Sequence, residues 1–392
     1  MPLVHMSDML NHAYRHGYAV GAFDLVSLDF LEGILAAAEN CNAPVILSLA
    51  ESHFGHYDFE LLMAATVAGA RRASVPVAIH LDHGASLESA VRAIRLGCNG
   101  VMVDTSAHPL DENLQQTLEI VAMAQACGVT VEGELGYVPG VEGEDAERHP
   151  GGAVYTSPEE AKAFVERSGV DCLAVSVGTV HGRMRGTPRL DYARLAEINQ
   201  AVGIPLVIHG GTGLSDEQFG KLIANGASKI NYYTALADVA GNGISRCAEA
   251  GEKSYTALTG GVKAAVRTET ERCIRLWGGD GRAVEVLAYC RPWREVEHLV
   301  LYNVDSRLDE AAAATLATQG MSALSAIPGV RSVAHGEAIQ RDARYRHCWL
   351  IRFASEAVVP GYRDHPAHLA YADRMFRPAA PDRLTMDFAI DR

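Results

Sequence analysis

The sequence predicts an α/β chain in which a (β/α)8 TIM barrel is followed by a small α+β domain of ferredoxin-like type. Its 392 residues are too many for one ordinary hydrophobic core, so two domains are expected. Short apolar runs alternate with helical stretches from about residue 18 to 235, and this order changes after about residue 292. We therefore expect a barrel domain over 1–285, a linker over 286–294 and a second domain over 295–392.

Eight short apolar runs are candidate strands, and segments of helical spacing such as Leu87–Leu96 and Leu114–Ala126 separate them. A strand that is each time followed by a helix is typical of a parallel sheet, and eight strands close a barrel. A doubly wound open sheet has the same alternation, so periodicity alone leaves both architectures open. The candidate strands are Tyr18–Phe23, Pro44–Leu49, Val77–Leu81, Gly100–Val103, Thr130–Glu134, Cys172–Val177, Leu206–His209 and Lys229–Asn231.

Polar residues gather where these strands end, and their positions favour the barrel. In a barrel the carboxyl ends of the strands converge on one mouth, whereas in an open sheet they are strung along an edge. The residues are His80, Asp82, His83, Asp104, Glu132, Glu134, His181, His209 and Asn231.

The last hundred residues have a different order of elements. The pattern predicts strand, helix, two strands, helix and strand, which is the order of a ferredoxin-like domain. The expected elements are Val296–Val304, Leu308–Ile327, Ser332–His335, Trp349–Phe353, Ala367–Phe376 and Leu384–Ile390.

The composition limits the classes of function. A formal net charge of -14 argues against a nucleic-acid partner or an anionic membrane, because both require a basic face. The chain does not start like a signal peptide, and none of its apolar runs is long enough to span a bilayer, so we expect a cytoplasmic location. The eight cysteines are scattered and indicate reduced thiols, which leaves histidines and carboxylates as ligands for any metal.

Three histidines at separate strand ends indicate a metal site. His83 follows Asp82, and His181 and His209 lie beside glycines, which allow close approach of the backbone to a ligand. Three neutral imidazoles that leave one position open are typical of catalytic zinc. Most of the 16 histidines are expected to be surface or core residues, but three in this arrangement favour a shared site.

The segment Gly210–Gly213 offers backbone N–H groups and the Thr212 hydroxyl just before a predicted helix, which suits a phosphate group. Thr234 would lie at the neighbouring strand end. Phosphate sites in barrels often use the last two loops, so this placement strengthens the interpretation.

Six segments, taken in order, carry a resemblance to a known family: HLDH, VMVDTS, VEGELG, GTVHG, HGGTG and KIN. Together they resemble the class II fructose- and tagatose-bisphosphate aldolase family, from about Met6 to Ala283. The resemblance implies a lyase that reversibly cleaves a phosphorylated ketose to dihydroxyacetone phosphate and an aldehyde through a metal-stabilised enediolate. It also implies one Zn²⁺ per subunit, with a monovalent cation as a further candidate.

The resemblance assigns roles to individual residues. Asp82 exchanges the proton of the C4 hydroxyl, Glu142 protonates the enediolate and Asn231 helps to hold it. The zinc ligands are His83, His181 and His209, and the acidic residues close to the metal, as second-shell or alternative ligands, are Asp104 and Glu134. The phosphate pocket comprises Gly182, Arg185, Gly210, Gly211, Thr212, Gly213 and Thr234. This chemistry needs no lysine Schiff base, so Lys229 is interpreted as structural.

The chain departs from the family pattern on the side expected to hold the aldehyde. Asp24 and Ser27 stand where the family has asparagines, Ala50 replaces a serine, and Tyr233 replaces a small or acidic residue. Asp24 adds negative charge and would disfavour a second phosphate nearby. We therefore hypothesise a changed aldehyde partner and a ketose 1-phosphate in place of a bisphosphate.

The C-terminal part resembles the stress-responsive dimeric α/β-barrel (Dabb) domain, in segments such as Ile327–Val330 and Tyr362–His368. The resemblance implies pairing of sheets between chains, and we expect a homodimer or homotetramer. His365 and His368 are candidates for a small-molecule or metal site, although hydrogen bonding at a helix start is the better-supported interpretation.

Two other functions stay open at this point. One is a barrel that has lost turnover and acts in binding or assembly, which the retention of both Asp82 and Glu142 argues against. The other is a zinc aldolase that acts on a non-phosphorylated substrate, which the glycine loops argue against.

Overall fold

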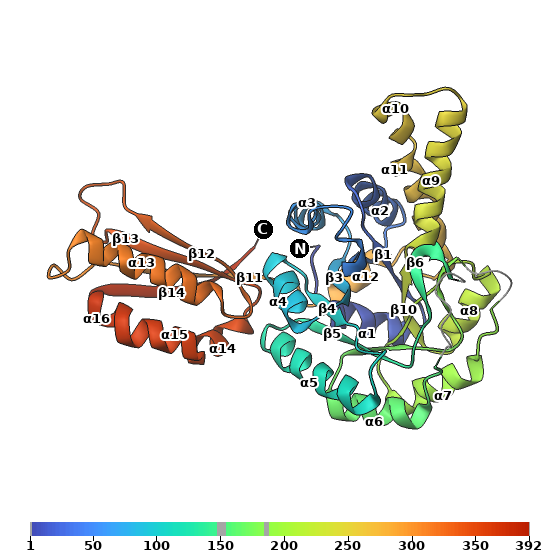
Figure 1. The fold of residues 1–392 in the computed structure, drawn as a ribbon, viewed down its shortest axis with the longest axis horizontal. Coiled ribbons are helices and arrows are strands. Elements are labelled where there is room, and N and C mark those ends of the chain that lie inside the picture. The colour runs from blue at the N-terminus through green and yellow to red at the C-terminus, as the bar shows by residue number, and fades with distance from the viewer. Residues whose placement is uncertain (1, 147–153, 184–187, 392) are drawn as a thin grey trace.

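The computed structural model describes residues 2–146, 154–183 and 188–391. Within these residues the first domain is a closed barrel of eight parallel strands, which confirms the TIM barrel and excludes the open sheet (Figure 1). The strands neighbour one another in the order β1-β10-β9-β7-β5-β4-β3-β2. Their bounds are β1 Val20–Asp24, β2 Val45–Ala50, β3 Val77–Gly84, β4 Gly100–Val103, β5 Thr130–Leu135, β7 Cys172–Val175, β9 Leu206–Ile208 and β10 Ala227–Tyr232.

A ring of helices surrounds the barrel, and serine or aspartate side chains cap many of their first turns. Ser215, for example, accepts a hydrogen bond from the Gln218 backbone N–H while the Gln218 side chain bonds back to Ser215, which is a complete capping box. The helices are α2 Leu28–Asn40, α3 Phe59–Arg72, α4 Leu87–Leu96, α5 Leu110–Ala126, α6 Pro158–Ser168, α7 Tyr192–Val202, α8 Asp216–Ala224 and α9 Thr234–Glu249.

Helix α1 (Met6–His16) closes the amino end of the barrel. Met6, Met9 and Leu10 are buried in one cluster with inward-facing strand residues such as Ile46 and Val207. Since this end is filled with side chains, ligands can reach the interior through the carboxyl end, where the polar residues lie.

The connections between the barrel strands, and the segment that follows the last strand, carry further elements. The short strands β6 (Gly140–Asp145) and β8 (His181–Arg183) pair with each other beside the mouth, and a 3-10 turn, η1 (Glu51–His53), follows β2. Helices α10 (Tyr255–Thr259) and α11 (Val262–Leu276) project with α9 (Figure 1). Helix α12 (Ala283–Tyr289) includes the first residues of the segment expected as a linker. This part of the chain is helical and packed, because Val286 is buried against α1.

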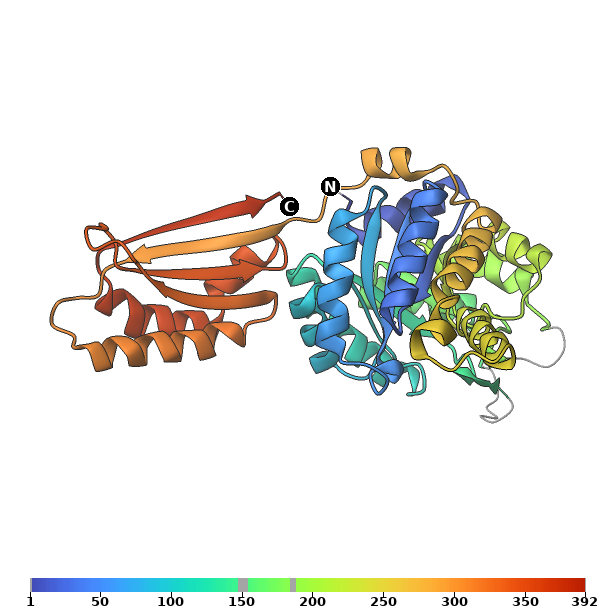
Figure 2. The same ribbon diagram turned by 90° about the horizontal axis from the view of Figure 1, so that it is seen from above.

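The second domain is an antiparallel sheet in the order β12-β13-β11-β14, which agrees with the predicted small α+β domain. Its helices cover one face of the sheet and leave the other bare (Figure 2). The elements are β11 Glu295–Tyr302, α13 Glu310–Ser325, β12 Val330–Glu337, β13 His347–Phe353, α14 Val358–Asp364, α15 Pro366–Tyr371, the π-helical turn η3 Ala372–Phe376, α16 Arg377–Ala379 and β14 Arg383–Ile390.

The two domains are held together by buried polar contacts at one end of the second sheet. Arg331 of β12 donates to the Leu96 carbonyl at the end of α4, over 2.7 Å, and pairs with Glu295. The Ser355 hydroxyl donates to the Cys127 carbonyl over 2.6 Å. These contacts fix the second domain against the side of the barrel, away from its mouth.

Candidate active site

Three imidazole rings meet at the mouth of the barrel. Nδ1 of His209 lies 2.9 Å from Nε2 of His83 and 3.4 Å from Nε2 of His181. In a tetrahedral zinc site with Zn–N bonds of 2.0–2.1 Å, two ligand nitrogens are about 3.3 Å apart. The spacing of the three nitrogens therefore fits a single zinc ion, and these residues also form one of the groups able to hold a metal.

The second nitrogen of each ring is held by an acceptor. His83 Nδ1 lies 3.0 Å from Asp104 Oδ2, His209 Nε2 lies 2.9 Å from Glu132 Oε1, and His181 Nδ1 lies 3.2 Å from the Val138 carbonyl. A ring that donates its proton to such an acceptor keeps a lone pair on its other nitrogen. The three lone pairs therefore point to the common centre, as a cation requires.

The local backbone explains how Asp82 and His83 both reach this centre. Neighbouring residues in a regular strand face opposite sides. Here the register between β3 and β4 shifts between Leu81 and Gly84, and His83 has a left-handed φ of 44°. The strand bends at this point, and both side chains turn into the mouth.

Asp82 lies in a buried hydrogen-bonded chain. Both of its carboxylate oxygens accept from Asn231 Nδ2 at 2.9 Å, and Asn231 Oδ1 accepts from Lys229 Nζ at 2.7 Å. Lys229 also donates to Glu132 Oε2 at 2.6 Å. Burial opposes charge on Asp82, but His83, His209 and Lys229 outweigh it and lower its pKa to about 2. Asp82 is therefore an ionised carboxylate of fixed orientation.

The pKa of Glu134 is shifted in the opposite direction. Burial, reinforced by the nearby Asp104 carboxylate, raises the pKa of Glu134 to about 7. Its Oε2 atom is buried without a hydrogen-bond partner among the described residues. Asp104 itself is held by the Ser106 hydroxyl and backbone N–H at 2.7 and 3.0 Å, and its other oxygen faces His83. Asp104 and Glu134 also form a second group with His83 that could hold a metal.

The predicted phosphate loops pack tightly around the site. Gly182 and Gly210 have φ of 84° and 69°, and a Cβ on Gly210 would lie 2.2 Å from the Val180 carbonyl oxygen. Thr234 Oγ1 accepts from the Gly143 N–H at 3.0 Å, and Thr212 Oγ1 accepts from the Ala235 N–H at 3.2 Å. Thr212 thus joins the loop after β9 to the start of α9, and Thr234 joins the start of α9 to β6; Gly211 nearby is buried, whereas Gly213 is exposed.

The side chains of two predicted site residues lie outside the part of the chain that the structure describes. Glu142 belongs to strand β6, but its side chain lies outside the described residues. Arg185 lies outside them entirely.

The residues expected on the aldehyde side occupy the ends of the first two strands and the starts of α2 and α9. Asp24 and Ala50 are fully buried, and Ala50 pairs with Asp82 in the register of β2 with β3. The Ser27 hydroxyl accepts from the Phe30 N–H at 3.4 Å and so caps α2. Tyr233 precedes α9 and is partly buried.

His53 is a residue of this region that sequence reasoning missed. Its ring centroid lies 4.2 Å from that of Tyr233, and both of its ring nitrogens are buried without a hydrogen-bond partner among the described residues. Burial lowers the pKa of His53 to about 4. The only signal in the sequence was a histidine three residues beyond the end of a strand, which is a weak one.

Comparison with known proteins agrees with both domains of the chain. The family profile described as "Fructose-bisphosphate aldolase class-II" matches residues 4–282, and the one described as "Stress responsive A/B Barrel Domain" matches residues 296–390.

Individual relatives match the barrel domain. The fructose-bisphosphate aldolase of Geobacillus stearothermophilus is 44% identical over 237 residues, which are 60% of this chain and 82% of that protein. The corresponding protein of Staphylococcus aureus (strain N315) is 40% identical over the same shares. The crystal structure of the YdjI aldolase from Escherichia coli K12 is similar, with a TM-score of 0.65 and 34% identity over 72% of this chain and 99% of that one.

Helices of membrane-spanning length and apolarity are absent from the part of the chain that the structure describes.

Proposed function

Because this chain belongs to the class II fructose-bisphosphate aldolase family, we propose that it is a zinc-dependent aldolase that reversibly cleaves a phosphorylated ketose to dihydroxyacetone phosphate and an aldehyde. The observation that carries this proposal is the convergence of three imidazole nitrogens next to an ionised, clamped aspartate. An acceptor behind each ring holds the proton of its second nitrogen, so the nitrogen that faces the centre is free to act as a ligand.

His83, His181 and His209 are the proposed zinc ligands. A zinc ion held there supplies a Lewis acid that polarises the substrate carbonyl and stabilises negative charge. Asp104 and Glu132 fix the orientation of two of the ligand rings, and removal of such partners typically weakens metal binding 10- to 100-fold. We assign Asp104 to this orienting role, with Glu134 as the neighbouring acid.

Asp82 is the proposed base. Its low pKa keeps it ionised, and the Asn231 amide bonds to both oxygens, so the carboxylate is ready to accept the proton of the C4 hydroxyl as the C3–C4 bond breaks. Lys229 fixes the Asn231 amide from behind. Glu142 is proposed to return a proton to C3 in the cleavage direction.

The phosphate group of the substrate is proposed to bind between Gly182, the loop Gly210–Gly213 and Thr234, together with Arg185. Gly182, Gly210 and Gly213 all have left-handed φ angles, which turn the backbone sharply at this point. Backbone N–H groups at the start of a helix attract anions, and α9 begins at Thr234.

We propose that the aldehyde half of the substrate is not the usual phosphorylated one. Asp24 places a buried carboxylate near Tyr57, whose pKa is raised by burial and by this carboxylate. The rings of His53 and Tyr233 pack against each other nearby, at an interplanar angle of 44°. A buried carboxylate and a neutral imidazole suit hydroxyl groups better than a second phosphate.

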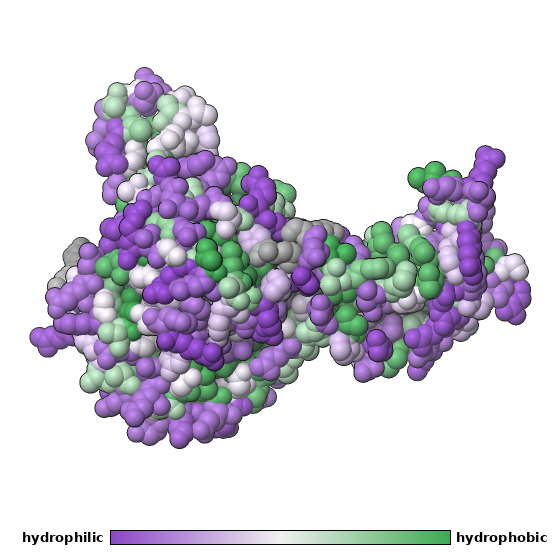
Figure 3. Space-filling view, turned by 180° about the vertical axis from the view of Figure 1, so that it is seen from behind, coloured by the Kyte–Doolittle hydropathy of each residue, from purple (hydrophilic) through white to green (hydrophobic). Residues whose placement is uncertain are grey.

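The bare face of the second sheet supports a homodimer. The strand register places six apolar side chains on this face. Four of them remain 40–43% accessible, namely Leu350, Leu384, Met386 and Phe388. Figure 3 shows the hydrophobic surface on this domain. An apolar patch of this kind is typical of an association surface. The six residues are Leu299, Leu301, Leu350, Leu384, Met386 and Phe388. We also propose a cytoplasmic location.

The test is metal analysis together with cleavage assays on the purified full chain. We expect about one zinc per chain and cleavage that is lost on chelation and restored by zinc. Fructose 1,6-bisphosphate, tagatose 1,6-bisphosphate and the matching ketose 1-phosphates are compared, and Asp82→Asn should abolish turnover of every substrate. A zinc-containing protein that cleaves none of them, as wild type or variant, would favour the non-catalytic alternative. Efficient turnover of a bisphosphate would exclude the proposal of a changed aldehyde partner. The proposed aldolase activity would still stand.

A further inference from the structure

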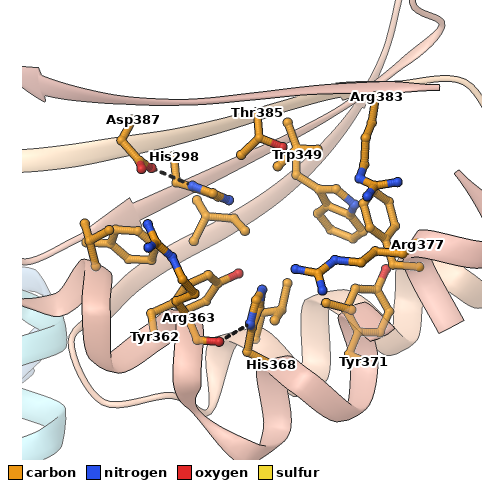
Figure 4. Close-up of a pocket in the computed structure, with 17 residues that line it drawn as sticks. His298, Trp349, Tyr362, Arg363, His368, Tyr371, Arg377, Arg383, Thr385 and Asp387 are labelled. Atoms are coloured by element: carbon orange, nitrogen blue, oxygen red, sulfur yellow. Dashed lines mark hydrogen bonds and ion pairs between the residues drawn. The ribbon is translucent and has the colours of Figure 1, made fainter. Parts of the chain in front are cut away.

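A cavity of about 400 Å³ lies inside the second domain, between the helix-covered face of the sheet and the helices α14 to α16 (Figure 4). We propose that it binds a small organic acid with an apolar, planar body, and that the carboxylate of this ligand is held by arginines. This site is separate from the barrel mouth, and the proposal does not depend on the aldolase activity.

The walls of the cavity are apolar and largely aromatic. The strand residues that face the helices supply one side, and aromatic side chains from α14, α15 and η3 supply the other. Tyr362 packs 4.7 Å from Phe353, and Trp349 meets Tyr371 edge-on at 6.3 Å, measured between ring centroids. Flat rings surround the space, which therefore suits a planar apolar body.

Arginines dominate the charged groups of the lining. Arg363, Arg377 and Arg383 contribute three guanidinium groups, against one carboxylate, that of Asp387. Neither Arg363 nor Arg383 has a carboxylate partner among the described residues, and Arg377 pairs with Asp373, which lies outside the lining. A local excess of positive charge in a chain with a net charge of -14 indicates an anionic ligand.

Two further polar groups can contact the ligand. Trp349 is 1% exposed, and its indole N–H has no hydrogen-bond partner among the described residues. His298 Nδ1 lies 2.6 Å from Asp387 Oδ1, so Asp387 holds the Nδ1 proton and leaves Nε2 as an acceptor. Figure 4 shows this pair at the opposite end of the cavity from Arg377 and Arg383. A ligand whose carboxylate meets the arginines and which carries a hydroxyl at its other end could therefore donate a hydrogen bond to His298 Nε2.

His365 and His368 have different roles at this site. His365 Nδ1 accepts from the Ala367 N–H at 3.2 Å and caps α15, as the structural interpretation expects. His368 lines the cavity, with its Nδ1 2.9 Å from the Arg363 carbonyl and its ring 4.5 Å from Tyr362. A sugar phosphate fits this lining poorly, because its hydroxyls would face aromatic walls without partners.

The experiment is a binding titration of the full-length, zinc-containing protein. The probes are naphthoate and its neutral counterpart naphthylmethanol. Their binding is measured by calorimetry and by tryptophan fluorescence, since Trp349 lines the cavity. We expect naphthoate to bind at least tenfold more tightly than naphthylmethanol. The double variant Arg377→Gln/Arg383→Gln should abolish this difference, and Thr385→Trp, which fills the cavity, should weaken both probes.

The control is Arg341→Gln, which removes an exposed arginine of the same domain that lies outside the cavity lining. It should leave naphthoate binding unchanged, and circular dichroism verifies that each variant is folded. The proposal is overturned if neither probe binds at millimolar concentration, if the two bind equally, or if Arg341→Gln weakens naphthoate as much as the double variant. It is also overturned if fructose 1,6-bisphosphate competes with naphthoate.

Discussion

The buried Lys229 ammonium donates to the Asn231 side-chain oxygen over 2.7 Å, and this contact leaves the Asn231 amide nitrogen facing Asp82. Lys229 thus takes part in positioning the proposed base, although its position in the sequence indicated a structural residue only. It also neutralises the buried Glu132 carboxylate, whose pKa it lowers against the effect of burial.

Replacement of Lys229 by methionine is predicted to lower both stability and turnover. Glu132 would lose its ion-pair partner, and removal of one partner of a buried ion pair costs about 3 to 5 kcal/mol. The double variant Lys229→Met/Glu132→Gln removes the Glu132 charge and keeps the acceptor for His209, so it should recover much of the unfolding free energy. Because Asn231 is still unsupported, kcat should stay low with little change in KM. Wild-type kcat in the double variant would contradict the positioning role.

Asp104→Asn is predicted to weaken zinc binding 10- to 100-fold, because His83 loses the charged acceptor that fixes its ring. The measurement is zinc retention during competition with a chelator, read by metal analysis. Asp111→Asn is the matched control, since Asp111 lies on the exposed side of α5 with a side chain that is 93% accessible. Equal zinc loss in the two variants would rule out the orienting role.

Gly210→Ala is predicted to displace the loop that carries His209. Besides its left-handed φ, a Cβ there would lie 2.2 Å from the Val180 carbonyl oxygen, one residue before His181. We expect loss of both zinc and activity. Gly213→Ala tests φ alone, because its φ is 87° and a Cβ there meets nothing within 4 Å. That variant should lose only about 1 kcal/mol of stability and keep its zinc.

His53 is predicted to make the stability of the protein depend on pH. Burial lowers its pKa to about 4 from an ordinary value near 6.5, so the unfolded chain binds more protons than the folded one between these values. Stability should therefore fall as the pH is lowered from 6.5 to 4, by at most about 3 kcal/mol from this residue. The His53→Gln variant should lack this part of the pH dependence of stability, which thermal melts at a series of pH values measure. Parallel curves for wild type and variant would show that His53 does not contribute.

Asp24→Asn is predicted to shift the substrate preference. Removal of the buried negative charge should raise kcat/KM for a ketose bisphosphate relative to the corresponding 1-phosphate. The ratio of the two constants is the measurement, and it is insensitive to a general loss of active enzyme. An unchanged ratio would show that Asp24 does not select against the second phosphate.

Much of the fold followed from local patterns. All eight predicted barrel strands are present, and the order of elements in the second domain agrees with the prediction. Such strands are recognisable because parallel strands buried on both faces are continuous apolar runs. Helix α12 was missed, because the burial of Val286 depends on contact with α1, which is far away in the sequence.

In the candidate site, too, local sequence predicted some features and long-range contacts decided the others. The sequence placed His83, His181 and His209 at strand ends, and this is enough to bring them to one mouth once the barrel closes. It could not show which nitrogen of each ring faces the centre, since the acceptors Asp104, Glu132 and the Val138 carbonyl come from other strands and loops.

The sequence by itself determined the alternation of strands and helices, the two domains and the polar residues at the strand ends, because these depend on periodicity and near neighbours. Tertiary structure decided the closure of the barrel, the packing of His53 against Tyr233 and the chain of hydrogen bonds from Glu132 to Asp82. It also brought Arg363, Arg377 and Arg383 around one cavity. These features depend on contacts between residues distant in sequence, whose positions are fixed only when the whole core has packed.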